Sequence, residues 1–358
     1  MSVPKLRFKE FDGGWSSLKY KDVLTIKYGK DHKLLNEGIY PVYGTGGIMR
    51  YADQYLHDGE SILIGRKGTI DQPKYVDEKF WTVDTLFYTQ IKDNSIPLFL
   101  YQHALQVNWS GLNEATGVPS LNTTSINNVD IALPPKEEQR KIASFLSAVD
   151  EKISQLTQKH QLLSQYKQGM MQKLFSQQIR FKADDGSEFA EWEQSLLGQH
   201  CQITTGKLDA NAMKEDGQYR FYTCAKDYYF IDIFAFDTEA LLISGNGAHV
   251  GYIHYYKGKF NAYQRTYVLD KWKHNIQFVK YFLAKYLKSR IYSEKKEGNT
   301  PYIVLATLSE MPFQAPCVQE QTKIANFLSA IDQKIEIAAQ QIEQAKQWKK
   351  GLLQQMFV

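Results

Sequence analysis

Apolar side chains recur at heptad spacing in two stretches of the chain, residues 142–174 and 324–356. One heptad phase collects them into an apolar seam in each stretch, and Lys167 and Lys349 interrupt the two seams at matching positions. The main seam residues are Ile142, Leu146, Val149, Ile153, Leu156, Leu163 and Met170 in the first stretch and Ile324, Leu328, Ile331, Ile335, Ile342 and Leu352 in the second. A seam sustained over about five heptads predicts two long helices that pack on each other as a coiled coil. We expect the pairing to be antiparallel, because each helix follows its own globular segment and the two copies are alike.

The two stretches are copies of each other. Residues 141–175 align with residues 323–357 at a constant offset of 182 without a gap, and sixteen of the 35 positions are identical. The segments before them correspond more loosely: Trp15 matches Trp192, and Gly29-Lys30 matches Gly206-Lys207. We infer a duplicated chain with the order globule, helix, globule, helix. A stalk for homodimers remains an alternative use of the helices.

Two glycines stand inside the helical pattern, at the equivalent positions Gly169 and Gly351. Glycine costs about 1 kcal/mol relative to alanine inside a helix. Its recurrence favours a close crossing of the two helices, and an early end of each helix is the alternative.

The globular segments contain short β-branched and aromatic runs broken by glycine, such as residues 61–65 and 241–245. These runs predict strands, and residues 97–107 and 275–292 predict helices, so each globule is expected to mix α and β structure. The fold class is therefore α+β.

Composition narrows the function only slightly. The chain has 358 residues with 43 Lys plus Arg against 39 Asp plus Glu, a balance that neither indicates nor excludes nucleic-acid binding. Three widely spaced cysteines suit a reducing compartment, and no apolar run is long enough to span a bilayer. We expect a cytoplasmic protein.

Catalytic motifs are missing from the sequence. We find no phosphate-binding loop of the Gly-x-x-x-x-Gly-Lys type, no methyltransferase motif and no histidine spacing typical of metal ligands. A nuclease site could be assembled from Asp71 with Asp77, Glu78 and Lys79, but charged clusters of this kind are common in turns. We therefore expect no catalytic centre, no metal and no bound cofactor in this chain.

The phrase LPPKEEQRKIASFL at residues 133–146 resembles the helical repeat of the DNA-specificity subunits of type I restriction-modification systems. The second copy repeats it with Glu320-Gln321, Ile324-Ala325, Leu328 and residues 332–335. The opening pattern of Trp15, Leu18 and Gly29-Lys30 also resembles the start of a target-recognition domain of that family.

The resemblance implies two pseudo-symmetric target-recognition domains, at residues 1–133 and 179–315, each followed by a conserved spacer helix, at residues 134–178 and 316–358. It further implies a non-catalytic subunit that reads a bipartite target in double-stranded DNA, with one half-site per domain. Two methyltransferase subunits and the motor and nuclease subunits would assemble on it, and they would hold S-adenosylmethionine, ATP and Mg²⁺. A self-contained nuclease or methyltransferase and a DNA-independent scaffold are the competing functions.

Matching turns of the two globules carry the candidate DNA contacts. Arg66-Lys67-Gly68 and Asn246-Gly247 occupy the same place with different side chains, as expected of sequence readers, although an ordinary hairpin turn needs only the glycine. The candidates are Lys30, Tyr43, Thr45, Arg66 and Lys67 in the first globule and Lys207, Tyr222, Lys226, Asn246 and Arg265 in the second.

Overall fold

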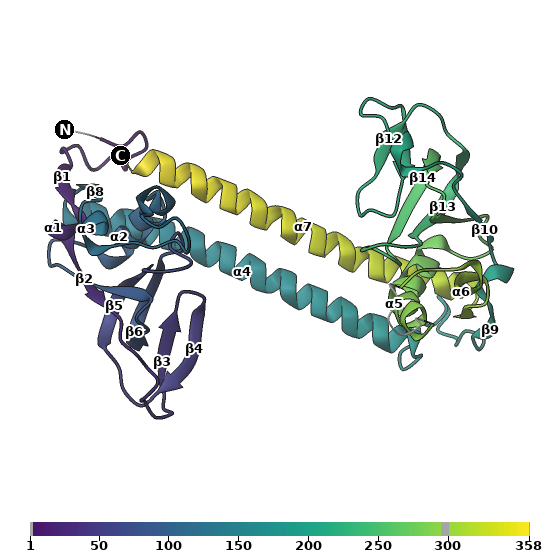
Figure 1. The fold of residues 1–358 in the computed structure, drawn as a ribbon. Coiled ribbons are helices and arrows are strands. Elements are labelled where there is room, and N and C mark those ends of the chain that lie inside the picture. The colour runs from purple at the N-terminus through teal and green to yellow at the C-terminus, as the bar shows by residue number, and fades with distance from the viewer. Residues whose placement is uncertain (1–2, 295–300, 358) are drawn as a thin grey trace. The chain divides into compact units, whose positions relative to one another are not determined.

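The computed structural model describes residues 3–294 and 301–357. The chain forms two compact units (Figure 1). Unit 1 contains residues 1–159 and 338–358, and unit 2 contains residues 160–337, so the division runs through both long helices. The predicted segment 316–358 includes Val358, which lies outside the described residues.

Unit 1 is built on a six-stranded sheet with the strand order β2-β7-β5-β6-β3-β4. The strands of unit 1 are β1 (Ser16–Lys19), β2 (Leu24–Tyr28), β3 (Tyr40–Gly44), β4 (Gly47–Ala52), β5 (His57–Gly65), β6 (Lys74–Thr82), β7 (Leu86–Ile91) and β8 (Asp130–Leu133). Its short helices are α1 (Tyr20–Val23), α2 (Pro97–Ala104) and α3 (Thr123–Asn127). Strands β1 and β8 form a separate antiparallel pair.

Unit 2 repeats this plan with the strand order β10-β15-β13-β14-β11-β12. Its strands are β9 (Glu193–Leu196), β10 (Gln202–Thr205), β11 (Tyr219–Tyr222), β12 (Tyr229–Ile231), β13 (Phe236–Ser244), β14 (Ile253–Ala262), β15 (Thr266–Asp270) and β16 (Pro312–Ala315). Its shorter helices are α5 (Ile276–Ser293) and α6 (Leu305–Ser309). The parallel pairings of β3 with β6 and of β11 with β14 also correspond.

The predicted short helices form with shifted ends. The helix expected at residues 275–292 is α5, Ile276–Ser293, which begins after Asn275 because the Asn275 side chain accepts from the Gln277 and Phe278 backbone N–H groups. The helix expected at residues 97–107 is shorter, because α2 ends at Ala104 and a 3₁₀ turn follows at Trp109–Leu112.

The two predicted long helices are α4 (Lys136–Phe175) and α7 (Val318–Met356), and both are unbroken (Figure 1). In unit 1, the beginning of α4, with Ile142 and Leu146, shares a buried cluster with Leu352 and Met356 near the end of α7. In unit 2, Leu174 at the end of α4 shares a cluster with residues at the beginning of α7. The pairing in each unit is therefore antiparallel, and every predicted seam residue is buried or half-buried. The α+β fold class with two similar domains is confirmed.

The lysines that interrupt the seams form matched ion pairs across the helices. In unit 1, Lys349 Nζ lies 2.6 Å from Asp150 Oδ1, and in unit 2, Lys167 Nζ lies 2.5 Å from Asp332 Oδ1. Because these four residues are two copies of one Lys and one Asp, both units use the same polar link. The interruptions are thus part of the duplicated interface.

The prediction that glycine permits a close helix crossing is wrong. Gly169 and Gly351 lie inside α4 and α7, which continue to Phe175 and Met356, so the alternative of an early helix end is wrong as well. A Cβ built at either glycine has no neighbouring atom within 4 Å among the described residues.

Candidate nucleic-acid interface

The turns that carry the candidate residues of unit 1 are joined by backbone hydrogen bonds. The Lys30 N–H after β2 donates to the Thr82 carbonyl at the end of β6, at 2.9 Å. The Arg66 N–H after β5 donates to the Thr85 carbonyl in the β6–β7 turn, also at 2.9 Å. Residues far apart in sequence are thus collected into one group of turns.

Unit 2 repeats the arrangement. The Gly245 N–H donates to the Arg265 carbonyl at 2.9 Å, in the place of the Arg66–Thr85 bond, and the Tyr263 N–H donates to the Tyr222 carbonyl at 2.9 Å. The equivalent bond in unit 1 runs from Val83 to Tyr43 at 3.0 Å. The same turn scaffold therefore holds different side chains in the two units.

Glycine is required where these turns meet. A Cβ at Gly29 would lie 2.0 Å from the Val83 carbonyl oxygen, and one at Gly206 would lie 1.8 Å from the Ala262 carbonyl oxygen. Both distances are far below contact, so the glycines that matched in sequence are kept by close packing. Gly68 and Gly247 also match, with φ of +89° and +77°, as an ordinary tight turn requires.

Most candidate side chains can reach solvent. The exposed ones are Lys30, Lys67, Lys207, Lys226 and Arg265, and the half-buried ones are Tyr43, Thr45, Arg66 and Asn246. Tyr222 requires a correction, because its side chain is only 1% exposed and lies in a buried cluster with Phe260 and Val268. This tyrosine is a core residue, so we remove it from the candidate DNA contacts.

Two candidates of unit 1 are held in place by neighbours. Arg66 Nη1 donates to the Asp84 carbonyl at 3.0 Å, and its guanidinium lies 5.5 Å from the centre of the Tyr28 ring. Tyr43 Oη donates to Glu78 at 2.5 Å, and burial together with this carboxylate raises the pKa of Tyr43. Its hydroxyl is therefore protonated and engaged, which leaves Arg66 as the more available donor.

A recess of about 550 Å³ opens among the turns of unit 1. Its wall includes Asp31, His32, Thr45, Met49 and Asp84. The recess lies beside the Arg66 contact at Asp84, so polar and apolar groups are both available there to a bound base or sugar.

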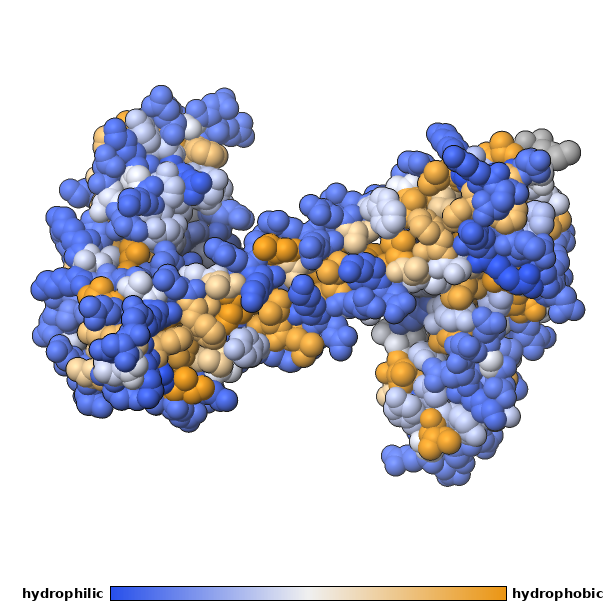
Figure 2. Space-filling model, turned by 180° about the vertical axis from the view of Figure 1, so that it is seen from behind, coloured by the Kyte–Doolittle hydropathy of each residue, from blue (hydrophilic) through white to orange (hydrophobic). Residues whose placement is uncertain are grey.

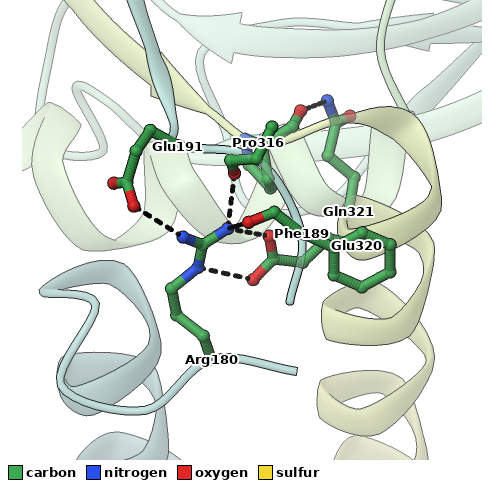
Figure 3. Close-up of polar contacts among 7 residues, drawn as sticks. Arg180, Phe189, Glu191, Pro316, Glu320 and Gln321 are labelled. Atoms are coloured by element: carbon green, nitrogen blue, oxygen red, sulfur yellow. Dashed lines mark hydrogen bonds and ion pairs between the residues drawn. The ribbon is translucent and has the colours of Figure 1, made fainter. Parts of the chain in front are cut away.

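The segment before the first strand of each unit is tied to a long helix by an ion pair that was not predicted from the sequence. In unit 2, the Arg180 guanidinium donates to both carboxylate oxygens of the buried Glu320, at 3.2 and 2.8 Å (Figure 3). In unit 1, Arg7 donates to both oxygens of the buried Glu138, at 2.7 and 2.8 Å. The tripeptide Arg-Phe-Lys, at residues 7–9 and 180–182, is the sequence signal that could have revealed this pair.

Each half of the helix pair also carries an aromatic patch at equivalent positions. The ring of Trp348 lies 6.0 Å from that of Phe145 in unit 1, and the ring of Tyr166 lies 6.5 Å from that of Phe327 in unit 2. Trp348 is 55% exposed and Tyr166 is 51% exposed. Figure 2 shows apolar areas on the paired helices among hydrophilic ones. We call these two pairs the aromatic patches.

Two residues of the alternative nuclease site, Glu78 and Lys79, are used in other contacts. Glu78 accepts from Tyr43, and Lys79 Nζ lies 3.6 Å from Asp58. Within the described ranges, no group of three or more His, Cys, Asp or Glu side chains is placed to hold a metal ion. Likewise, no described helix is long and apolar enough to cross a membrane.

Comparison with known proteins identifies similar chains. The type I restriction enzyme EcoDI specificity subunit of Escherichia coli is 39% identical over 158 residues, which cover 44% of this chain and about a third (35%) of that relative. The MjaVIII specificity subunit of Methanocaldococcus jannaschii is 25% identical over 97% of this chain and 94% of its own length. The putative MjaX specificity subunit of the same organism is 30% identical over 72% of this chain and 65% of its own length.

Solved structures share the fold. The S subunit of a type I restriction-modification system from M. genitalium superposes with a TM-score of 0.72 at 20% identity, over 100% of this chain and 99% of that one. A chain from a study of complex assembly and conformational transition of the type I R-M system superposes with a TM-score of 0.56 at 15% identity, over 96% and 97% of the two chains. The model of the type I restriction modification DNA specificity domain matches residues 12–165 and 190–347. With two such domains, the chain belongs to the family of type I restriction-modification specificity subunits.

Proposed function

We propose that this chain supplies the DNA sequence specificity of a type I restriction-modification complex and performs no catalysis itself. Each unit would read one half of a bipartite target in double-stranded DNA. The proposal rests on the turn scaffold, which both units build with the same backbone hydrogen bonds. The side chains on this scaffold differ: unit 1 has Arg66 and Lys67 where unit 2 has Gly245 and Asn246. Base readout depends on such side chains, whereas the scaffold positions them.

Lysine and arginine side chains around the turns support DNA as the ligand. Lys30 and Lys67 in unit 1 and Lys207, Lys226 and Arg265 in unit 2 are exposed. Contacts between such cations and phosphates provide affinity that is independent of sequence and falls with salt. We propose that the protein meets its DNA target in the cytoplasm.

The aromatic patches would dock two methyltransferase subunits. Exposed aromatic side chains are enriched at protein interfaces, and Trp348 and Tyr166 occupy equivalent positions of the duplicated helices. Two equivalent patches suit two copies of one partner. Those subunits would hold S-adenosylmethionine, and the motor and nuclease subunits would hold ATP and Mg²⁺.

The decisive experiment combines the purified chain with its methyltransferase subunits and maps methylation on random-sequence DNA. We expect two short specified blocks separated by an unspecified gap of constant length. A continuous recognition sequence, or no sequence preference, would contradict the proposal.

The same preparation tests the competing functions. Methyl transfer or Mg²⁺-dependent cleavage by the chain alone would favour a self-contained enzyme. Partner binding without any DNA footprint would favour a DNA-independent scaffold. We expect neither result.

A further inference from the structure

Arg220 of β11 is enclosed by aromatic rings in unit 2. Its guanidinium carbon lies 4.2 Å from the centre of the Tyr228 ring and 4.6 Å from the centre of the Tyr256 ring. Two rings at these distances stack on a guanidinium and restrict its orientation. The side chain therefore has a defined position before any ligand binds.

The guanidinium retains most of its hydrogen-bonding capacity. Arg220 Nη1 donates one hydrogen bond to the hydroxyl oxygen of Tyr222, two residues further along β11, at 3.4 Å. Among the described residues, no carboxylate forms an ion pair with Arg220. Because the group has five N–H donors and donates only this one side-chain hydrogen bond among the described residues, most of its donors remain available to a planar acceptor.

Arg220 lies close to the turn that the sequence analysis assigned to DNA. It is two residues before Tyr222, after which the turn to Lys226 begins, and it is half-buried. Tyr228, Tyr229 and Phe230 beside it are each 39% exposed. The guanidinium edge is thus held at a surface rich in aromatic side chains.

Unit 1 has no equivalent arginine. Tyr222 of β11 lies opposite Ala262 of β14, and Tyr43 of β3 lies opposite Thr82 of β6. Because Ala262 and Thr82 occupy equivalent places in the two sheets, Tyr222 corresponds to Tyr43. Arg220 therefore corresponds to Pro41. A phosphate contact would serve both half-sites alike, whereas a base contact is expected to differ between domains that read different sequences.

We propose that Arg220 reads a guanine in the half-site recognised by unit 2, through paired hydrogen bonds from its guanidinium edge to guanine O6 and N7. This inference rests on the proposed function. Arginine paired with these two acceptors in the major groove is a common base-specific contact. The rings of Tyr228 and Tyr256 act as positioning groups that hold the fork in plane.

The test uses the complex of the full chain with its methyltransferase subunits. The wild-type target is mapped first, and each base pair of the second half-site is then substituted in turn. Arg220→Lys keeps the charge but loses the planar fork, and Tyr228→Leu removes one positioning ring. Arg140→Lys, the same substitution at an exposed position of α4, is the matched control.

We expect Arg220→Lys to lower discrimination at one G·C pair of the second half-site by about tenfold to a hundredfold, and to leave the first half-site unchanged. Tyr228→Leu should have a smaller effect at the same pair. Retained specificity at the first half-site reports that the protein is folded.

Two results would overturn the inference. Unchanged discrimination at every pair would show that Arg220 does not read a base. A small and equal loss of binding at all sequences would identify a phosphate contact instead, because lysine keeps the positive charge that a phosphate needs. Failure of the proposed function itself is distinguishable, because the wild-type complex would then have no bipartite target.

Discussion

At the residue scale, several buried polar groups are matched in pairs between the units. Glu138 and Glu320 are both fully buried, and each is neutralised by one arginine from the segment before the first strand of its unit. A buried carboxylate without such a partner is strongly destabilising. These ion pairs therefore fix the path of the chain as it approaches each domain.

The stability of unit 1 depends on pH through His103. Its ring is buried, Tyr20 Oη lies 2.9 Å from Nδ1, and burial lowers the pKa of His103 to about 4. In the unfolded chain the histidine pKa is about 6.5, so the unfolded chain binds more protons than the folded chain between pH 6.5 and pH 4. The contribution of His103 to the unfolding free energy is therefore fully present above this range and is lost as the pH falls through it.

We expect unit 1 to lose about 2 kcal/mol of unfolding free energy between pH 7 and pH 5 from this histidine. Urea unfolding at both pH values measures the loss. His103→Gln should be less stable at pH 7, because the contact with Tyr20 changes, but should show a smaller pH difference. An equal pH difference in both proteins would assign the effect to other groups.

At the element scale, the helix pair combines an apolar seam with a repeated polar link. The Lys349–Asp150 and Lys167–Asp332 pairs occupy equivalent places in the two units. Polar pairs inside an apolar interface disfavour shifted registers, because a shift leaves the charges without partners. The two matched ion pairs therefore favour one register of α4 against α7.

Gly169 and Gly351 weaken these helices without a packing benefit. Because a Cβ at either position meets open space in the described structure, alanine can be accommodated without a clash. We expect Gly169→Ala and Gly351→Ala each to raise the unfolding free energy by about 1 kcal/mol. Thermal and urea unfolding would measure the gain, and Gly206→Ala serves as a destabilising control because its Cβ would overlap a backbone carbonyl.

At the scale of the whole molecule, we propose that the length of the helix pair sets the unspecified gap between the two half-sites, which is the spacer role that the family resemblance implies. Both long helices are continuous, with 40 residues in α4 and 39 in α7. A seven-residue insertion preserves the heptad phase and adds about 10 Å to a helix. This length corresponds to roughly three base-pair steps of about 3.4 Å.

We therefore expect heptad insertions in both helices, after Lys159 and after Ile337, to lengthen the unspecified gap by about three base pairs while the two half-sites stay the same. Methylation mapping with the partner subunits gives the gap directly. An insertion in α4 alone should impair assembly, because the paired seams lose their register. An unchanged gap in the double variant would refute the spacer role.

The sequence by itself determined the duplication, the apolar seam and the family, because periodicity and repeated phrases are properties of consecutive residues. It also predicted the matching turns, since glycine marks both copies. Its assignments failed where side-chain environment matters. Tyr222 matched Tyr43 in sequence, but only the packing of the sheet buries its ring.

Only the tertiary structure decided which polar groups meet across long separations. The stacking of Arg220 depends on Tyr256, a residue of another strand, and the burial of Glu320 depends on Arg180, which is 140 residues away. Neither neighbour is signalled by local spacing, because strand pairing and helix packing bring such residues together. The physical reason is that a helix or strand pattern reports which face is buried, whereas the contacts on that face are set by the whole fold.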